Sequence, residues 1–199
     1  MRVTDWAGSP PADAKQAEQM LLQGALACAK RHGVAKVNIK RVAEQVGVTR
    51  QTVYRYFPSS QALVDAVSWH LVSGVMKKLD KHLASVSGFE DKVIESVIFL
   101  TEKIPNDPYL KQYFTTSGFD RQNLAELFAD STLNYCYEYL KSLYGTNTFT
   151  KKEEKWLREL AEHLLRTVLS LIVTPSPVTE TKQGKREYLG LWLKPLLQF

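Results

Sequence analysis

The chain has 199 residues, 44% of them hydrophobic, which is enough for one domain or two small ones with a packed core. Its formal net charge is +5. No apolar run approaches the length of about 18 residues that indicates a membrane-spanning helix. Residues 1–12 include Asp5, Gly8, Pro10 and Pro11 and no apolar run, so we expect no signal peptide. These features argue against a membrane protein and predict a cytoplasmic one.

The positive charge is unevenly distributed along the chain. Residues 1–60 hold nine Lys and Arg against four Asp and Glu, whereas residues 61–199 hold seventeen of each kind. The whole surplus therefore lies in the first part of the chain. This distribution is typical of a segment that binds a polyanion, attached to an electrically balanced body. Binding to a membrane surface would instead favour a long basic amphipathic helix, which we do not find.

Periodic apolar residues predict helices along the whole chain, and no segment has a strand pattern of any strength. We therefore predict an all-α fold of about nine helices. Residues 1–9 are expected to form a loose arm. A first helix is expected from about Pro10, with Ser9 as its cap, to His32, where Gly33 ends it.

Residues 38–57 predict two short helices joined by a tight turn. The first helix has an apolar face with the spacing i, i+3, i+4 and i+7, formed by Ile39, Val42, Ala43 and Val46. Asn38 stands where an N-cap belongs, and Gly47 can take the positive φ that ends a helix. Thr49 can then cap a second helix that runs to about Phe57.

The second helix of this pair has two unlike sides. Val53 and Phe57 lie together and are expected to face inward, whereas Gln51 and Arg55 point the opposite way. Its Arg, Gln, Thr and Tyr side chains can donate hydrogen bonds to base edges and to phosphates. This arrangement suits a helix-turn-helix whose second helix enters the major groove. An ordinary helical hairpin with a solvated polar face is the alternative.

Five further helices and a short helical segment are expected beyond this motif, at about residues 59–86, 90–104, 109–114, 120–144, 150–173 and 181–197. Thr150 and Glu153 have the spacing of a capping box. Pro105 is expected to stop one of these helices, and Pro195 to kink or fray the last turn of another.

The run IKRVAEQVGVTRQTVYRYFPSSQALVDAV closely resembles the N-terminal helix-turn-helix of the tetracycline-repressor-like (TetR) transcription factors. That family shows the pattern "IA…aGvs…tlYryF…k..L", and the resemblance covers about 50 residues. It implies a DNA-binding domain over residues 1–58 and a helical domain for ligand binding and dimerisation over residues 59–199. The implied DNA-contacting residues are Lys40, Thr49, Arg50, Gln51, Thr52, Tyr54, Arg55, Tyr56 and Ser60.

Two of these positions have particular roles in the resemblance. Tyr54 is similar to the tyrosine with which the family contacts a phosphate. Ser60 stands where the family commonly has a lysine, so one positive charge and its counterion release are lost. We therefore expect a shallower salt dependence of DNA binding than a lysine-bearing relative would have.

The last two helices are too apolar for a solvated surface. Such helices bury two sides, either inside a monomer or against their own body and a partner. The family pairs its last two helices into a four-helix bundle, so the resemblance implies a homodimer through Leu157–Ile172 and Tyr188–Phe199. A dimer would match the two-fold symmetry of a palindromic operator.

The middle of the chain is rich in aromatic residues, which form either ordinary core or an apolar cavity for a small hydrophobic effector. The residues that we nominate for such a cavity are Trp69, Met76, Phe99, Tyr113, Phe114, Phe128, Tyr135 and Tyr139, with His163 as a polar contact. A ligand there would tilt the fourth helix and change the spacing of two recognition helices.

Catalytic and metal-binding motifs are missing from the sequence. It has no G-x-S-x-G, G-x-G-x-x-G, P-loop, H-E-x-x-H or C-x-x-C motif, and its four histidines and two cysteines have no ligand spacing. We expect no enzyme, no metal, no cofactor and two reduced thiols. The leading hypothesis is a ligand-responsive, dimeric transcriptional repressor. The second is a helical small-molecule-binding protein or enzyme with a vestigial helix-turn-helix.

Overall fold

The computed structural model describes residues 6–107, 110–111, 128–146 and 148–198. Eight α-helices and several short 3-10 turns lie within these ranges, which contain no strand. The predicted all-α fold is confirmed. The chain divides into two compact units, Met1–Met76 and Lys77–Phe199. Helix α4 (Ser60–Leu83) begins in the first unit and ends in the second, and the boundary that we drew after residue 58 stays a prediction.

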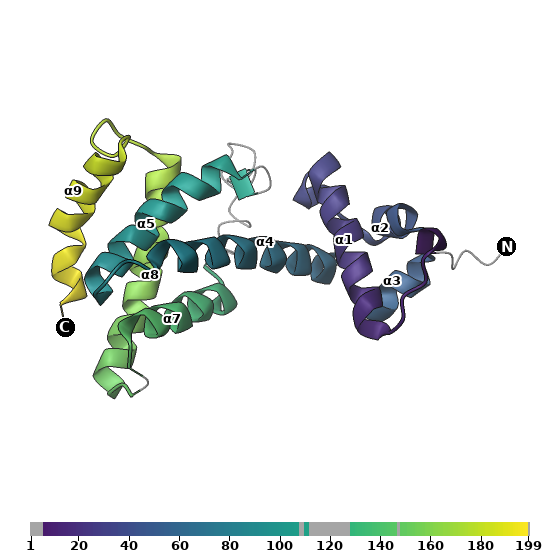
Figure 1. Cartoon of the computed structure of the whole chain (residues 1–199), viewed down its shortest axis with the longest axis horizontal. Coiled ribbons are helices and arrows are strands. Elements are labelled where there is room, and N and C mark those ends of the chain that lie inside the picture. Colours follow the sequence, from purple (N-terminus) through teal and green to yellow (C-terminus); the bar gives the residue numbers. More distant parts are fainter. Residues whose placement is uncertain (1–5, 108–109, 112–127, 147, 199) are drawn as a thin grey trace. The chain divides into compact units, whose positions relative to one another are not determined.

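The first unit contains α1 (Ala14–His32), α2 (Ile39–Val46) and α3 (Arg50–Tyr56), with α1 packed on α2 and α2 on α3 (Figure 1). Its fully buried side chains come from these three helices and from the first half of α4, and they include Leu21, Val42, Val53, Leu63 and Val67. The two helices of the predicted motif begin and end within one residue of the expected positions.

The start of the chain differs from our expectation. Helix α1 begins at Ala14 rather than near Pro10, because the Asp13 carboxylate caps it by accepting the Gln16 backbone N–H at 2.7 Å. Residues 6–8 form a 3-10 turn in which the Trp6 ring is buried, so this part is not a loose arm. Burial of a large aromatic ring gives the segment enough apolar contact to be fixed against the unit.

Gly24 allows α1 and α2 to pack closely. A Cβ atom added at Gly24 would lie 2.3 Å from Val46 Cγ2, which is far inside van der Waals contact. Gly24 and Val46 are both buried. The close approach of these two helices therefore requires a residue without a side chain at position 24.

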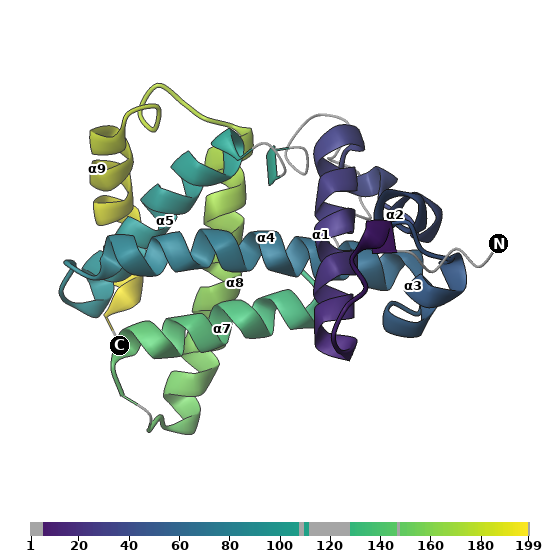
Figure 2. The ribbon, with the colours of Figure 1, turned by 45° about the vertical axis from the view of Figure 1, so that its right-hand side comes forward.

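The second unit contains α5 (Phe89–Asn106), α7 (Asp130–Tyr144), α8 (Lys151–Val173) and α9 (Lys182–Trp192). Helix α8 packs against both α5 and α7, and α9 packs against α5 (Figure 2). The core of the unit is one cluster of apolar side chains from these four helices and from the turn after α9, with Ile98, Leu157 and Leu189 among the most deeply buried.

The ends of these helices test several local predictions. The capping box at α8 is confirmed, because Thr150 and Glu153 exchange both hydrogen bonds. Helix α9 ends at Trp192, before the expected end near residue 197, and Pro195 lies in a separate 3-10 turn (Lys194–Leu197) instead of in a kinked last turn of the helix. Helix α5 continues to Asn106, so Pro105 is accommodated in its last turn instead of stopping it. The expected helical segment at 109–114 and residues 120–127 lie outside the described residues, apart from 110–111.

One buried carboxylate connects three helices of the second unit. The side chain of Glu95 on α5 is 7% exposed. One of its oxygens lies 3.1 Å from His82 Nε2 at the end of α4, and the other forms an ion pair with Arg186 on α9. A buried charge is tolerated only when it is paired in this way. Glu95 therefore fixes the end of α4 to the rest of the second unit.

Gly24→Ala is expected to destabilise the first unit, because overpacking a close contact typically costs about 1–3 kcal/mol. The matched control is Gly74→Ala in α4, where an added Cβ would meet nothing within 4 Å. Alanine favours a helix by about 1 kcal/mol over glycine in both variants, so the difference between them isolates the packing cost. Urea unfolding followed by circular dichroism measures that difference. Equal stability of the two variants would contradict the close contact.

Candidate nucleic-acid interface

The turn between α2 and α3 is fixed by backbone and capping hydrogen bonds. Asn38 Oδ1 accepts the Arg41 N–H at 3.0 Å and begins α2. Gly47 takes the left-handed conformation, with φ 75° and ψ 36°, and ends that helix. The Val48 N–H then donates to the Ala43 carbonyl at 2.9 Å. This geometry is the glycine C-cap that the sequence predicted.

Helix α3 is held in place by one cap and one buried face. Thr49 Oγ1 accepts the Thr52 N–H at 3.1 Å. Val53 is completely buried and Phe57, directly after the helix, is 5% exposed. The expectation that these two side chains face inward is confirmed. Burial of this face leaves the opposite face of α3 to solvent.

Four of the predicted DNA-contacting residues of α3 are exposed, namely Arg50, Gln51, Tyr54 and Arg55. The Tyr54 side chain is 53% exposed, which is a high value for a large aromatic ring. Thr52 is half-buried, and its hydroxyl lies 2.9 Å from that of Thr49. The threonine pair therefore stabilises the start of the helix, and a DNA contact by either member stays a prediction.

Arg55 and Tyr56 contact each other at the exposed end of α3. Arg55 Nη2 donates a hydrogen bond to the Tyr56 hydroxyl at 2.9 Å. The guanidinium carbon lies 5.0 Å from the centre of the Tyr56 ring, within range of a cation–π interaction. The sequence pattern contained no signal for this pairing, because adjacent residues on a helix point about 100° apart.

The two predicted contacts outside α3 have partners within the protein. Lys40 is exposed, and its Nζ lies 4.0 Å from Glu44 Oε1 one turn later, a weak surface ion pair. The Ser60 hydroxyl accepts the Ile39 N–H at 3.4 Å and so links the first turn of α4 to the first turn of α2. Ser60 remains exposed and has a structural partner at the same time.

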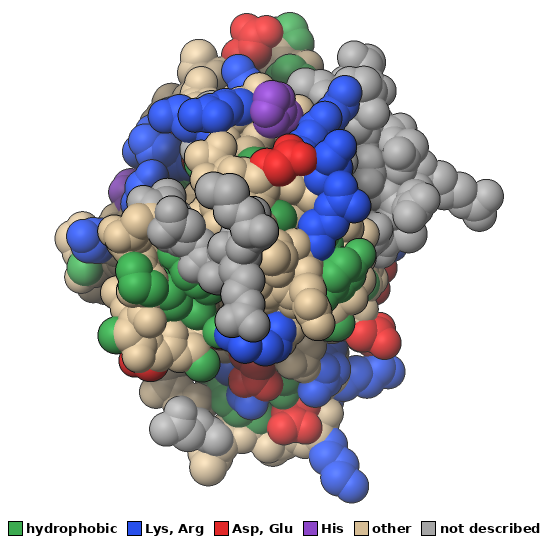
Figure 3. Space-filling model, turned by 90° about the vertical axis from the view of Figure 1, so that its right-hand side faces the viewer, with side chains coloured by type: hydrophobic (Ala, Val, Ile, Leu, Met, Phe, Trp, Pro, Cys, Tyr) green, Lys and Arg blue, Asp and Glu red, His purple; other side chains and the backbone are tan. Residues whose placement is uncertain are grey.

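The unit that contains this motif has many exposed cationic side chains. Exposed lysines and arginines of the first unit include Lys15, Lys30, Lys36, Lys40, Arg50 and Arg55. Figure 3 shows Lys and Arg side chains spread over the face that it presents, with fewer Asp and Glu among them. A surface of this kind attracts a polyanion and raises its local concentration.

Most of the described residues nominated for an effector cavity lie on α4, α5, α7 and α8. Trp69 and Met76 belong to the first unit and the others to the second. In the second unit, Phe99 is buried beside His82, and Phe128 lies under Arg166.

Tyr139 donates to Asp80 at 3.0 Å. Tyr135 is half-buried and His163 is exposed. Tyr113 and Phe114 lie outside the described residues, and the effector site stays a prediction.

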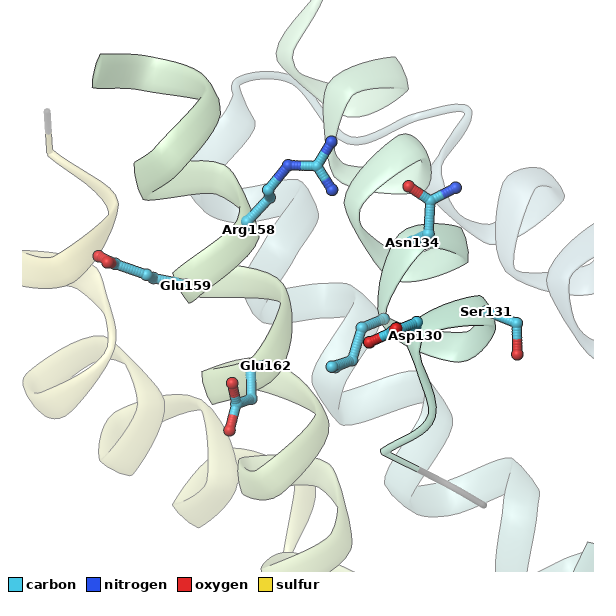
Figure 4. Close-up of a pocket in the computed structure, with 7 residues that line it drawn as sticks. Asp130, Ser131, Asn134, Arg158, Glu159 and Glu162 are labelled. Carbon is cyan, nitrogen blue, oxygen red and sulfur yellow. The ribbon is translucent and has the colours of Figure 1, made fainter. Parts of the chain in front are cut away.

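The described part of the second unit contains a polar groove that was not predicted from the sequence. It has a volume of about 540 Å³ and lies between α7 and α8, lined by Asp130, Ser131, Leu133, Asn134, Arg158, Glu159 and Glu162. Figure 4 shows Asn134 and Asp130 rising from α7 and Arg158 and Glu162 from α8. The i, i+4 spacing of polar residues on each helix was the available signal, but it is also typical of a solvated face.

The two cysteines are free thiols, as expected. Cys28 is buried and Cys136 is half-buried. Burial raises the pKa of both, that of Cys136 to about 11. Within the described ranges, no group of His, Cys, Asp and Glu could hold a metal ion, and no helix is long and apolar enough to cross a bilayer.

Comparisons with known proteins agree with this geometry. A family described as "Bacterial regulatory proteins, tetR family" matches residues 21–67, from α1 into α4. A search of curated proteins finds no match.

Several solved structures are similar to the chain, including those of AlkX and FadR. The TetR family repressor AlkX from Dietzia sp. strain DQ12-45-1b, implicated in biodegradation of n-alkanes, is 18% identical, with a TM-score of 0.59 over 96% of this chain and 100% of that chain. The fatty acid degradation regulator FadR from Bacillus halodurans is 15% identical, with a TM-score of 0.49 over 87% of this chain and 94% of that chain. The likeness to AlkX shows a shared fold.

Proposed function

We propose that this chain is a ligand-responsive transcriptional repressor, because its residues 21–67 match the family described as "Bacterial regulatory proteins, tetR family". It binds a palindromic operator as a homodimer in the cytoplasm and is released by a small hydrophobic effector. The observation that carries the proposal is α3, a capped helix anchored by Val53 that exposes Arg50, Gln51 and Arg55.

The exposed residues divide into two kinds of DNA contact. Arg50, Gln51 and Arg55 carry paired donors or acceptors that can read base edges in the major groove. Lys40 and the hydroxyls of Tyr54 and Ser60 suit phosphates, which position the protein without reading sequence. The positive surplus of residues 1–60 supplies the salt-dependent part of the affinity.

A second copy of the chain is the proposed partner of α8 and α9. Tyr188, Leu191 and Trp192 follow the helical spacing i, i+3 and i+4 on α9, and they are 38%, 65% and 64% exposed. Leu196 in the following turn and Val173 at the end of α8 are also exposed. Large apolar side chains gathered in this way are typical of an interface.

The proposed effector acts through α4, whose two ends belong to different units. A compound that prefers one orientation of α4 shifts the population toward that state and changes the spacing of the two recognition helices in the dimer. An effect of about 100-fold on operator affinity requires a coupling free energy of about 2.7 kcal/mol. A hydrophobic effector is consistent with the n-alkane degradation in which AlkX is implicated.

Arg50→Ala should weaken binding to the DNA upstream of the gene and relax its sequence preference, because a base contact is worth about 1–3 kcal/mol of discrimination. Electrophoretic shifts at two salt concentrations measure both effects. Lys151→Ala removes an exposed charge of the second unit and serves as the control that should bind like the wild type. If Arg50→Ala also binds like the wild type, the assignment of α3 is wrong.

Leu191→Asp should convert a dimer into a monomer, because a carboxylate would be buried without a partner in the interface. Val178→Asp changes a side chain of nearly equal exposure, 62%, outside the proposed interface and should leave the dimer intact. Sedimentation at micromolar concentration distinguishes the two states. A wild-type mass near 22.6 kDa would reject the dimer.

A panel of linear and aromatic hydrocarbons should contain compounds that raise the melting temperature, because a ligand that binds only the folded state stabilises it. The same compounds should release the operator in the shift experiment. Sugars and sugar phosphates are the polar comparison and should do neither. Release by the polar set alone would contradict a hydrophobic effector.

A further inference from the structure

We infer that Tyr56 is a positioning residue that orients Arg55 to read a guanine, an inference that rests on the proposed DNA-binding function. Its basis is the double contact between the two side chains, a hydrogen bond of 2.9 Å and a ring contact of 5.0 Å. Tyr56 is half-buried, whereas Arg55 is exposed. The tyrosine is therefore the fixed member of the pair and the arginine the member that reaches out.

The hydrogen bond leaves Arg55 with the donors that a guanine requires. Arg55 Nη2 uses one N–H for the Tyr56 hydroxyl. Its second N–H and both N–H groups of Nη1 remain available, so both terminal nitrogens can still donate. Guanine presents two acceptors, O6 and N7, side by side in the major groove, and a guanidinium matches them with two parallel hydrogen bonds. No other base presents two acceptors there.

Holding the guanidinium before DNA arrives lowers the entropy lost on binding. Immobilising a long side chain reduces affinity by a factor of roughly two to ten. Tyr56 removes part of that loss only when Arg55 makes an ordered contact. Its effect should therefore appear at one base position rather than in binding to all DNA alike.

A direct phosphate contact by Tyr56 is the competing role. In that case the hydroxyl would favour every duplex equally, since phosphates carry no sequence information. The two roles are separated by Tyr56→Phe, which keeps the ring and removes only the hydroxyl. Tyr54→Phe is the matched control, because Tyr54 is exposed and has no hydrogen-bond partner among the described residues.

The test selects duplexes from a random pool with the wild type, Tyr56→Phe, Arg55→Ala and the double variant, and then measures the affinity of single-base variants of the selected site. We expect Arg55→Ala to lose a guanine preference at one position in each half-site. Tyr56→Phe should lower the same preference by roughly two- to tenfold and leave the affinity for unrelated duplexes unchanged. In the Arg55→Ala background, Tyr56→Phe should have no further effect. Tyr54→Phe should weaken all duplexes alike.

Three results would overturn the inference: an equal loss on all duplexes with Tyr56→Phe, an additive loss in the double variant, or a preference of Arg55 for a base other than guanine. Each of these leaves the proposed function intact, because the wild type still selects a site. If the wild type selects no sequence, the proposed function fails and the inference fails with it.

Discussion

Burial of one face of α3 is the constraint on which the proposed interface depends. A helix of seven residues, Arg50–Tyr56, is too short to be stable alone, because each isolated helix must first form a costly nucleus. Here the Thr49 cap and the burial of Val53 and Phe57 supply the stabilising free energy that the backbone hydrogen bonds of so short a helix do not provide. The same burial fixes the rotation of the helix, so Gln51 and Arg55 are exposed as a consequence of packing.

Helix α4 is held by polar contacts at each of its ends. In the first unit, its Ser60 hydroxyl accepts the Ile39 N–H at the start of α2. In the second unit, His82 contacts the buried Glu95, which is paired with Arg186 on α9. In the proposed mechanism, a change in the packing of α5 or α9 would act on one end of a continuous helix whose other end is bonded to α2. This continuity gives the proposed effector a physical route to α3.

Much of the first unit could be predicted from sequence because its determinants are local. Asn38, Gly47 and Thr49 fix helix ends through bonds to residues three or four positions away, and the apolar period fixes which faces are buried. Asp13 was missed because two capping signals compete within a few residues. The pairing of Glu95 with Arg186, 91 residues apart, depends on tertiary packing that no local pattern contains.

Ser60 links the chemistry of the interface to its stability. A lysine at this position would offer a phosphate a positive charge but no acceptor for a backbone N–H. The serine hydroxyl accepts the Ile39 N–H and retains a proton that it can donate to a phosphate. It therefore contributes to the α2–α4 junction, and in the proposed DNA complex it would release one counterion fewer than a lysine. In the proposed DNA complex, fewer charge contacts mean that base edges read by α3 supply a larger share of the binding free energy. The orientation of Arg50, Gln51 and Arg55 then matters more for this chain than for a relative with a lysine at that position.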